Sequence, residues 1–271
     1  MFQANRPAPG ITHIQDCMGV CFTLIEGKNR ALLFDTGYGI SDCAAYVRSL
    51  TELPVKVILS HGHHDHVLGA AFFPETYMCE ADLAEFRLRT GEEQRSRVKQ
   101  QAEAQGIPVP AGFLTAPIAE PKPLRFPEKL GEFALAREEL GGREVWIIHV
   151  PGHTPGSVVM YIPDGELLLT GDDWNPCTWM WFPSSTGAQD WRDRMKTLIR
   201  LIEKTNPVRT VICSHQSMPR SGEEMKNFLA EMTDERLREA PAADMGSPIR
   251  THEARISPED WLVFDMDKIR T

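Results

Sequence analysis

The feature that most constrains this chain is a run of metal-binding side chains at the end of a predicted strand. Residues 55–59 are mostly apolar and read as a strand, and residues 60–66 then read Ser-His-Gly-His-His-Asp-His. Because side chains alternate along extended backbone, His61 and His63 point the same way, while Asp65 and His66 follow where the chain turns into a helix. Imidazole and carboxylate are the usual ligands of catalytic zinc. Four such donors within six residues favour two neighbouring metal ions, and a solvated histidine-rich turn is the alternative.

Three further candidate ligands each follow a short apolar run elsewhere in the chain. They are His153, Asp172 and His215. Taken singly, a buried histidine or aspartate is more often a hydrogen-bonded core residue than a ligand. Sites at the strand ends of α/β proteins, however, collect side chains from distant positions in this way. Together with the first cluster, the three residues favour a shared metal site.

With these residues in place, the sequence resembles the metallo-β-lactamase superfamily. The resemblance rests on the motif at 61–66, on His153, Asp172 and His215 in the family's order, and on Asp35 as the counterpart of an earlier aspartate motif. It spans about residues 20–216. It implies a fold of the α/β class, a four-layer αβ/βα sandwich with a binuclear metal site at one edge.

The resemblance also implies how the ligands divide between two divalent metal ions, with zinc expected and manganese or iron as alternatives. One ion would be held by His61, His63 and His153, and the other by Asp65, His66 and His215. Asp172 would bridge the two ions, and Asp35 would orient a ligand without binding metal itself. Asp65 is also the predicted catalytic residue, because it could orient a metal-bridging hydroxide and shuttle its proton.

The expected reaction is metal-dependent hydrolysis, in which that hydroxide attacks a small ester, thioester or lactone. True β-lactamases of the superfamily carry a zinc-binding cysteine at the place of Asp172 and are exported, so antibiotic hydrolysis is disfavoured. The ligand pattern is closer to glyoxalase II-like thioesterases, lactonases and phosphodiesterases. The alternatives are a phosphodiesterase or nuclease, an iron-dependent oxidoreductase using the same ligand cage, and a metal-stabilised binding protein.

Composition limits the partners of such an enzyme. The chain has 29 Lys and Arg against 38 Asp and Glu, a formal net charge of −9 that disfavours nucleic acid and anionic lipid. No run approaches the ~18 apolar residues of a membrane span, and the N-terminus has no apolar signal segment. Six cysteines in a chain of this length, without a C-x-x-C pair, do not make a disulfide scaffold, and with no export signal we expect a cytoplasmic protein. We therefore expect a small-molecule substrate, no nucleic acid and no membrane, and a homo-oligomer is left open.

We expect one domain over residues 1–271, with a proline-rich arm at 106–123 that is a loop or covering segment. Capping-box patterns at 90–93 and 221–224 predict two helix starts, and the spacing of apolar residues predicts an amphipathic helix at 189–205.

Two features near the candidate ligands have alternative interpretations. Residues 174–182 hold half of the six tryptophans and Phe182. They read as an apolar wall of a substrate pocket, or equally as a core patch or dimer contact. Arg220 could receive an anionic group, although a plain surface arginine is the simpler interpretation.

Overall fold

The computed structural model describes residues 2–270 and confirms the predicted α/β class. The chain divides into two compact units. The first holds the residues up to Arg125, Glu138–Val145 and Ser214–Met218, and the second holds Phe126–Arg137, Trp146–Cys213 and the residues from Pro219 onward. A single domain over 1–271 therefore stays a prediction. Within 2–270, every helix is too short or too polar to cross a membrane.

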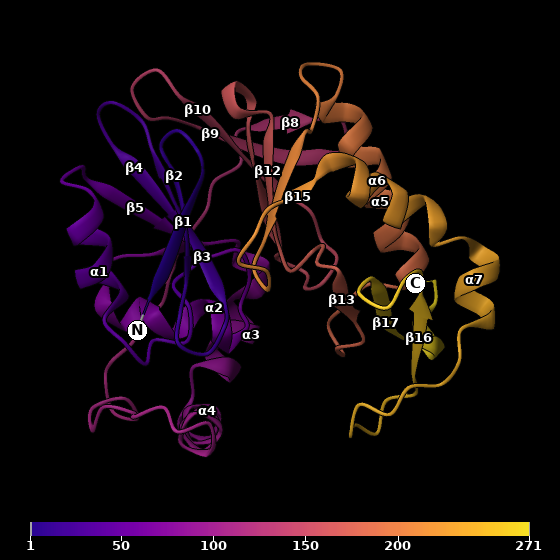
Figure 1. Cartoon of the computed structure of the whole chain (residues 1–271), viewed down its shortest axis with the longest axis horizontal. Coiled ribbons are helices and arrows are strands. Elements are labelled where there is room, and N and C mark those ends of the chain that lie inside the picture. The colour runs from indigo at the N-terminus through magenta and orange to yellow at the C-terminus, as the bar shows by residue number, and fades with distance from the viewer. Residues whose placement is uncertain (1, 271) are drawn as a thin grey trace. The chain divides into compact units, whose positions relative to one another are not determined.

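The first unit is built on a seven-stranded sheet whose strands lie in chain order. Figure 1 labels the first five of these strands. The strands are β1 (Gln3–Ala8), β2 (Ile11–Gln15), β3 (Cys21–Glu26), β4 (Ala31–Phe34), β5 (Val55–Ile58), β6 (Tyr77–Met78) and β7 (Lys122–Pro123). The first four pair antiparallel, and β4 to β7 pair parallel. Parallel neighbours need crossover connections, and the helices of this unit lie in those connections.

Three helices of the first unit pack on one face of its sheet, namely α1 (Cys43–Leu50), α2 (His64–Val67) and α3 (Leu83–Arg89). The fourth helix, α4 (Glu92–Ala104), contributes its buried apolar residues to a separate cluster. Apolar residues of α1, α2 and α3 form one buried cluster with alternate strand residues such as Phe22, Leu24 and Leu33. Because side chains alternate along a strand, these residues lie on the same face of the sheet.

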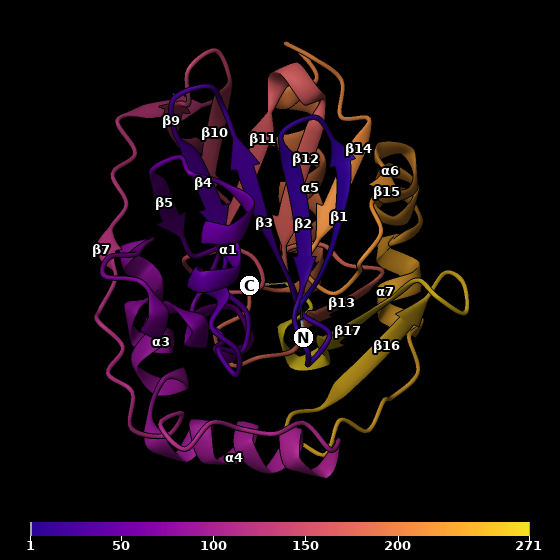
Figure 2. The same cartoon turned by 60° about the vertical axis from the view of Figure 1, so that its left-hand side comes forward.

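The proline-rich arm, residues 106–123, is the predicted loop over most of its length and connects α4 to β7 (Figure 2). Arg95 of α4 is buried, and its Nη1 donates hydrogen bonds to the carbonyls of Phe113, Leu114 and Ala116 in the arm. Burial lowers the pKa of this guanidinium from its ordinary value. Arg95 thus ties the arm to α4.

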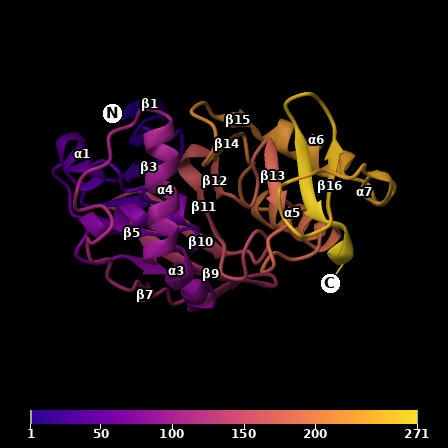
Figure 3. The same ribbon diagram turned by 90° about the horizontal axis from the view of Figure 1, so that it is seen from below.

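The second unit contains a seven-stranded and a three-stranded sheet (Figure 3). In sheet order, the larger one consists of β15 (Arg220–Ser221), β14 (Thr210–Cys213), β12 (Leu167–Gly171), β11 (Val158–Ile162), β10 (Glu144–His149), β9 (Phe133–Glu139) and β8 (Glu128–Leu130). The smaller one consists of β13 (Cys177–Met180), β17 (Trp261–Asp265) and β16 (Thr251–Arg255). Strands β12 and β14 pair in parallel, as do β13 and β17.

The helices of the second unit are α5 (Ala188–Ile202), α6 (Gly222–Glu231) and α7 (Asp234–Glu239). The amphipathic helix predicted at 189–205 is α5, which ends three residues earlier. Its apolar face, with Trp191 and Met195, packs with Phe228 of α6 and with alternate residues of the larger sheet in one buried core. Burial of this apolar area is the main stabilising contribution to such a layer.

The structure confirms the capping box predicted at 221–224 and contradicts the one predicted at 90–93. At α6 the box forms as predicted, because the Ser221 hydroxyl accepts the Glu224 N–H and the Glu224 carboxylate accepts the Ser221 N–H. At α4 the residue before the helix is Gly91. Thr90 instead ends α3, and its hydroxyl donates to the Phe86 carbonyl. The threonine side chain is thereby engaged by the preceding helix and does not cap the next one.

Candidate metal site

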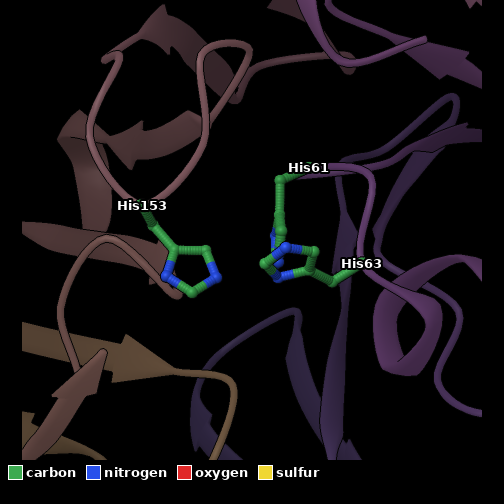
Figure 4. A group of neighbouring side chains, drawn as sticks. All are labelled: His61, His63 and His153. Atoms are coloured by element: carbon green, nitrogen blue, oxygen red, sulfur yellow. The ribbon is translucent and has the colours of Figure 1, made fainter. Parts of the chain in front are cut away.

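Five of the predicted ligands lie in the first unit, four of them in the loop after β5 and in α2. The ring centroid of His61 lies 4.7 Å from that of His63 (Figure 4) and 4.1 Å from that of His66. Oδ2 of Asp65 is 3.5 Å from Nε2 of His66 and 3.6 Å from Nε2 of His215. His61, His63 and His66 are buried and His215 is exposed. Within this unit, residues far apart in sequence therefore form one cluster of nitrogen and oxygen donors.

The two remaining predicted ligands lie in the second unit. His153 lies in the loop after β10 (Figure 4), and Asp172 directly follows β12. Nε2 of His153 is 3.7 Å from Oδ2 of Asp172, and both side chains are buried. Both positions follow strand ends, as the sequence predicts.

A buried aspartate fixes the protonation pattern of two histidines. Oδ2 of Asp35 lies 2.8 Å from Nδ1 of His66, and because a carboxylate only accepts, His66 carries its proton on Nδ1. The hydroxyl of Ser60 also donates to Oδ2 of Asp35 at 2.8 Å. That hydroxyl has one proton, so its 2.9 Å contact with Nδ1 of His61 is donated by the imidazole. In their neutral form both histidines therefore keep the lone pair on Nε2, as metal-ligating histidines do.

The second unit orients His153 in the same way. Nδ1 of His153 lies 2.7 Å from the carbonyl oxygen of Trp179, and a carbonyl can only accept this bond. The His153 backbone N–H donates to Oδ1 of Asp173 at 3.0 Å, and the Ser185 hydroxyl donates to the His153 carbonyl at 2.7 Å. The ring is thus held with the Nε2 lone pair toward Asp172.

The charges around Asp65 favour its ionised form. Burial alone would raise the pKa of this carboxyl, but attraction to His66, His64 and His215 outweighs that effect and lowers the pKa below its ordinary value. Burial lowers the pKa of His64. A carboxylate must be deprotonated to bind metal, so the surroundings of Asp65 suit that role.

Two residues that hold the donors in place were not predicted from the sequence. His13 on β2 is buried, and its Nε2 lies 2.8 Å from the carbonyl of Gln216, the neighbour of His215. Oδ2 of Asp82 accepts the Gly62 N–H at 2.7 Å, between two predicted ligands. These pairs are separated by 203 and 20 residues, so no local sequence signal identifies them.

Position 62 has no room for a side chain and therefore requires glycine. A Cβ atom at this position would lie 2.7 Å from the backbone nitrogen of Phe86, which is closer than real contacts allow. The absence of a side chain therefore lets the loop pack directly against the start of α3.

The two ambiguous features near the ligands are now placed within the second unit. The guanidinium of Arg220 lies 3.1 Å from Glu224 and 3.2 Å from Asp260, so it is paired with carboxylates. Trp174 is fully buried in the core of the unit, whereas Trp179 is 39% exposed. The aromatic segment is therefore partly core and partly surface.

Comparison with known proteins identifies the family of the chain. The family model described as "Metallo-beta-lactamase superfamily" matches residues 17–215. A curated relative is the acyl-coenzyme A thioesterase MBLAC2 of Gallus gallus, 27% identical over 170 residues, covering 56% of this chain and 60% of the relative. Another is the hydroxyacylglutathione hydrolase GloC of Haemophilus influenzae, 24% identical over 220 residues, covering 76% of this chain and 90% of that protein. The chain therefore spans only about three fifths of the length of MBLAC2.

A solved structure supports the fold. The metallo-β-lactamase family protein of Thermus thermophilus has a TM-score of 0.58 at 20% identity, covering 85% of this chain and 81% of that one. At this identity the likeness shows the fold alone, and the fold agrees with the predicted αβ/βα sandwich. Because the family model matches more than half of the chain, the chain belongs to the metallo-β-lactamase superfamily.

Proposed function

We propose that the chain is a binuclear metal-dependent hydrolase of small carboxylic esters, thioesters or lactones. Membership of the superfamily and the histidine and aspartate donors support a metal-dependent hydrolase in general. The observation that carries the proposal is the protonation pattern. Nδ1 of His61, His66 and His153 is engaged by an internal oxygen, which leaves Nε2 to bind metal.

The proposed division of the ligands is the one that the family resemblance implies. One ion would be held by His61, His63 and His153, and the other by Asp65, His66 and His215, with Asp172 bridging. The donors are imidazole nitrogens and carboxylate oxygens without thiolate, a set typical of catalytic zinc rather than of closed structural sites. Zinc is the proposed metal, and iron or manganese would accept the same donors.

Divalent ions in this donor set would supply a Lewis acid and a water of lowered pKa. Asp65 is the proposed catalytic residue because its Oδ2 lies within 3.6 Å of two other donors and its side chain is not fully enclosed. Its carboxylate would accept the proton of the attacking water and return it to the leaving oxygen or sulfur. The water oxygen bonds to the acyl carbon, the C–O or C–S bond breaks, and a carboxylic acid and an alcohol or thiol result.

Thioesters are the first substrates to test. Two relatives are named as an acyl-coenzyme A thioesterase and a hydroxyacylglutathione hydrolase, which supports acyl transfer to water over phosphodiester cleavage. The formal charge of −9 also disfavours a long polyanionic substrate.

The test is a substrate panel on protein stripped of metal and reloaded with Zn²⁺, Mn²⁺ or Fe²⁺. The panel contains an acyl thioester, an aryl ester, a lactone and bis(p-nitrophenyl) phosphate. We expect carboxylic substrates to be hydrolysed only after reloading, with two ions bound per chain. Faster cleavage of the phosphodiester, or equal activity without metal, would overturn the proposal.

The role of Asp65 has its own test. Asp65→Ala should lower kcat by about 10²–10⁴-fold, the usual contribution of acid–base catalysis. The matched control is Asp267→Ala, because Asp267 forms an exposed ion pair with Arg250 and such pairs contribute little to stability. Circular dichroism should show both variants folded, and full activity in Asp65→Ala would remove that residue from the mechanism.

A further inference from the structure

Three aromatic rings in the second unit form a continuous surface, which we call the aromatic shelf. It consists of Trp179 on β13 and of Trp181 and Phe182 directly after that strand. The rings of Trp181 and Phe182 stack at 4.7 Å with an interplanar angle of 23°. The Trp179 ring lies 5.9 Å from Trp181 and 6.3 Å from Phe182. The three rings are therefore in mutual contact.

The aromatic shelf adjoins a candidate metal ligand. The ring of Phe182 lies 5.2 Å from that of His153 in a T-shaped arrangement. The backbone carbonyl of Trp179 also accepts the Nδ1–H of His153. The residues that form the shelf thus also hold His153, so a molecule on the shelf would lie beside that side chain.

Strand geometry keeps the shelf at the surface. On β13 the side chains of Thr178 and Met180 are buried, so Trp179 between them points to the opposite face. The strand is fixed by parallel pairing with β17, where Val263 is the partner of Trp179. Trp179 is 39% exposed, and Trp181 and Phe182 are half-buried. The outward-facing ring, together with its two half-buried neighbours, offers an apolar face that a small ligand can contact.

The exposed area is too small for a stable protein interface. Within residues 2–270 the exposed large hydrophobic side chains are Leu88, Trp179 and Met218, and Trp179 alone belongs to the second unit. One exposed ring and two half-buried ones fall far below the roughly 1,200 Å² that specific interfaces bury. A small ligand is the occupant that this area suits, and ring faces favour offset or edge contact with another aromatic ring.

We propose that the aromatic shelf binds a planar aromatic group of the substrate, on either side of the bond that is cleaved. This inference rests on the proposed hydrolysis and narrows its substrate class to aryl-bearing thioesters or esters. Trp179 is then a specificity-determining residue, whose side chain contacts the substrate while its backbone positions His153.

The kinetic test compares four thioesters on the metal-loaded protein. Benzoyl, hexanoyl and acetyl esters of one aliphatic thiol vary the acyl group, and an acetyl ester of thiophenol varies the leaving group. Trp179→Ala should lower kcat/KM for one of the two aryl substrates about three- to ten-fold relative to the aliphatic acetyl ester, the effect of losing one aromatic pair. Trp179→Phe should keep most of the wild-type ratio of kcat/KM between the aryl substrate and the aliphatic acetyl ester.

An equilibrium measurement gives a readout that needs no metal. In metal-free protein, 2-naphthoate should quench tryptophan fluorescence at saturating concentration, and Trp179→Ala should raise its Kd by a similar factor. Leu88→Ala is the matched control, because Leu88 is 66% exposed on α3 in the first unit. Its Kd and its substrate ratios should equal those of the unchanged protein.

The outcomes separate this inference from the proposed hydrolysis. Binding of naphthoate that depends on Trp179, without hydrolysis of any thioester, ester or lactone, would support the shelf and refute the hydrolase. Unchanged substrate ratios and unchanged naphthoate binding in Trp179→Ala would overturn the shelf, even in an active hydrolase. An equal loss for the hexanoyl and benzoyl esters would also overturn it, since the surface would then respond to size rather than to planar rings.

Discussion

Replacing Asp35 by asparagine should weaken metal binding without unfolding the first unit. The Asp35 carboxylate accepts three hydrogen bonds, from the N–H and hydroxyl of Ser60 and from Nδ1 of His66. Its φ of 69° lies in the left-handed region, which asparagine tolerates better than most residues, so Asp35→Asn keeps the backbone. The change is confined to one oxygen that becomes an NH₂ group.

The size of the effect follows from that exchange. The amide oxygen can still accept the Ser60 N–H, but the new NH₂ group then faces Nδ1 of His66, which must accept. Accepting at Nδ1 moves the imidazole proton to Nε2, the atom that would bind metal. Loss of such an outer partner typically lowers metal affinity 10–100-fold, or about 1.4–2.7 kcal/mol. The ion held by His66 should lose most, because the Ser60 hydroxyl can rotate and partly spare His61.

Two measurements on Asp35→Asn test this reasoning. Competition with a chromophoric zinc chelator gives the affinity of each ion, and ¹H–¹⁵N spectra of the imidazoles in metal-free protein give the tautomer of His66. The matched control is Asp82→Asn, because the amide oxygen can keep the bond from the Gly62 N–H. Wild-type affinity for both ions, with the His66 proton still on Nδ1, would refute the argument.

Three further variants test other supports of the structure. Ser60→Ala should lower the affinity for the ion proposed at His61 about tenfold, because it removes the acceptor of the His61 Nδ1–H. Chelator competition would measure this affinity. His13→Phe should lower the free energy of unfolding in urea by about 0.5–1.5 kcal/mol, because the hydrogen bond between His13 and the Gln216 carbonyl is lost. Burial lowers the pKa of His13, so on acidification the unfolded chain binds a proton at this histidine before the folded chain does. The free energy of unfolding of the wild-type protein should therefore decrease as the pH falls below about 6.5, and this decrease should be smaller in His13→Phe. Arg95→Met should release the proline-rich arm and speed its limited proteolysis, whereas an unchanged rate would show that the three carbonyl bonds do not hold it.

Local pattern was sufficient to predict where the donors lie along the chain. Apolar runs followed by histidine or aspartate marked strand ends, and the structure places β5, β10, β12 and β14 before those residues. The capping box of α6 was predictable for the same reason, since both partners lie within four residues. The prediction at α4 was wrong because Thr90 ends α3 and its hydroxyl bonds within that helix. Residues 90–93 alone do not reveal this alternative partner.

The orientation of the donors could not be predicted, because it depends on partners far away in sequence. Asp35 and His66 are 31 residues apart, and His13 and Gln216 are 203 apart. Sheet pairing brings such residues together, and several registers would satisfy the same apolar pattern of each strand. The ligand roles themselves stay predictions that the metal-binding experiments test.

The aromatic segment shows why composition alone left two interpretations open. Residues 177–180 read Cys-Thr-Trp-Met, which has no alternation of polar and apolar side chains to reveal a buried face. The face is decided by pairing with β17, some 80 residues later, which leaves Thr178 and Met180 inside and Trp179 outside. Trp174, which precedes the strand, is instead fully buried. An exposed tryptophan beside a candidate ligand is therefore a consequence of register, and a one-residue shift of β13 would bury Trp179 and remove the aromatic shelf.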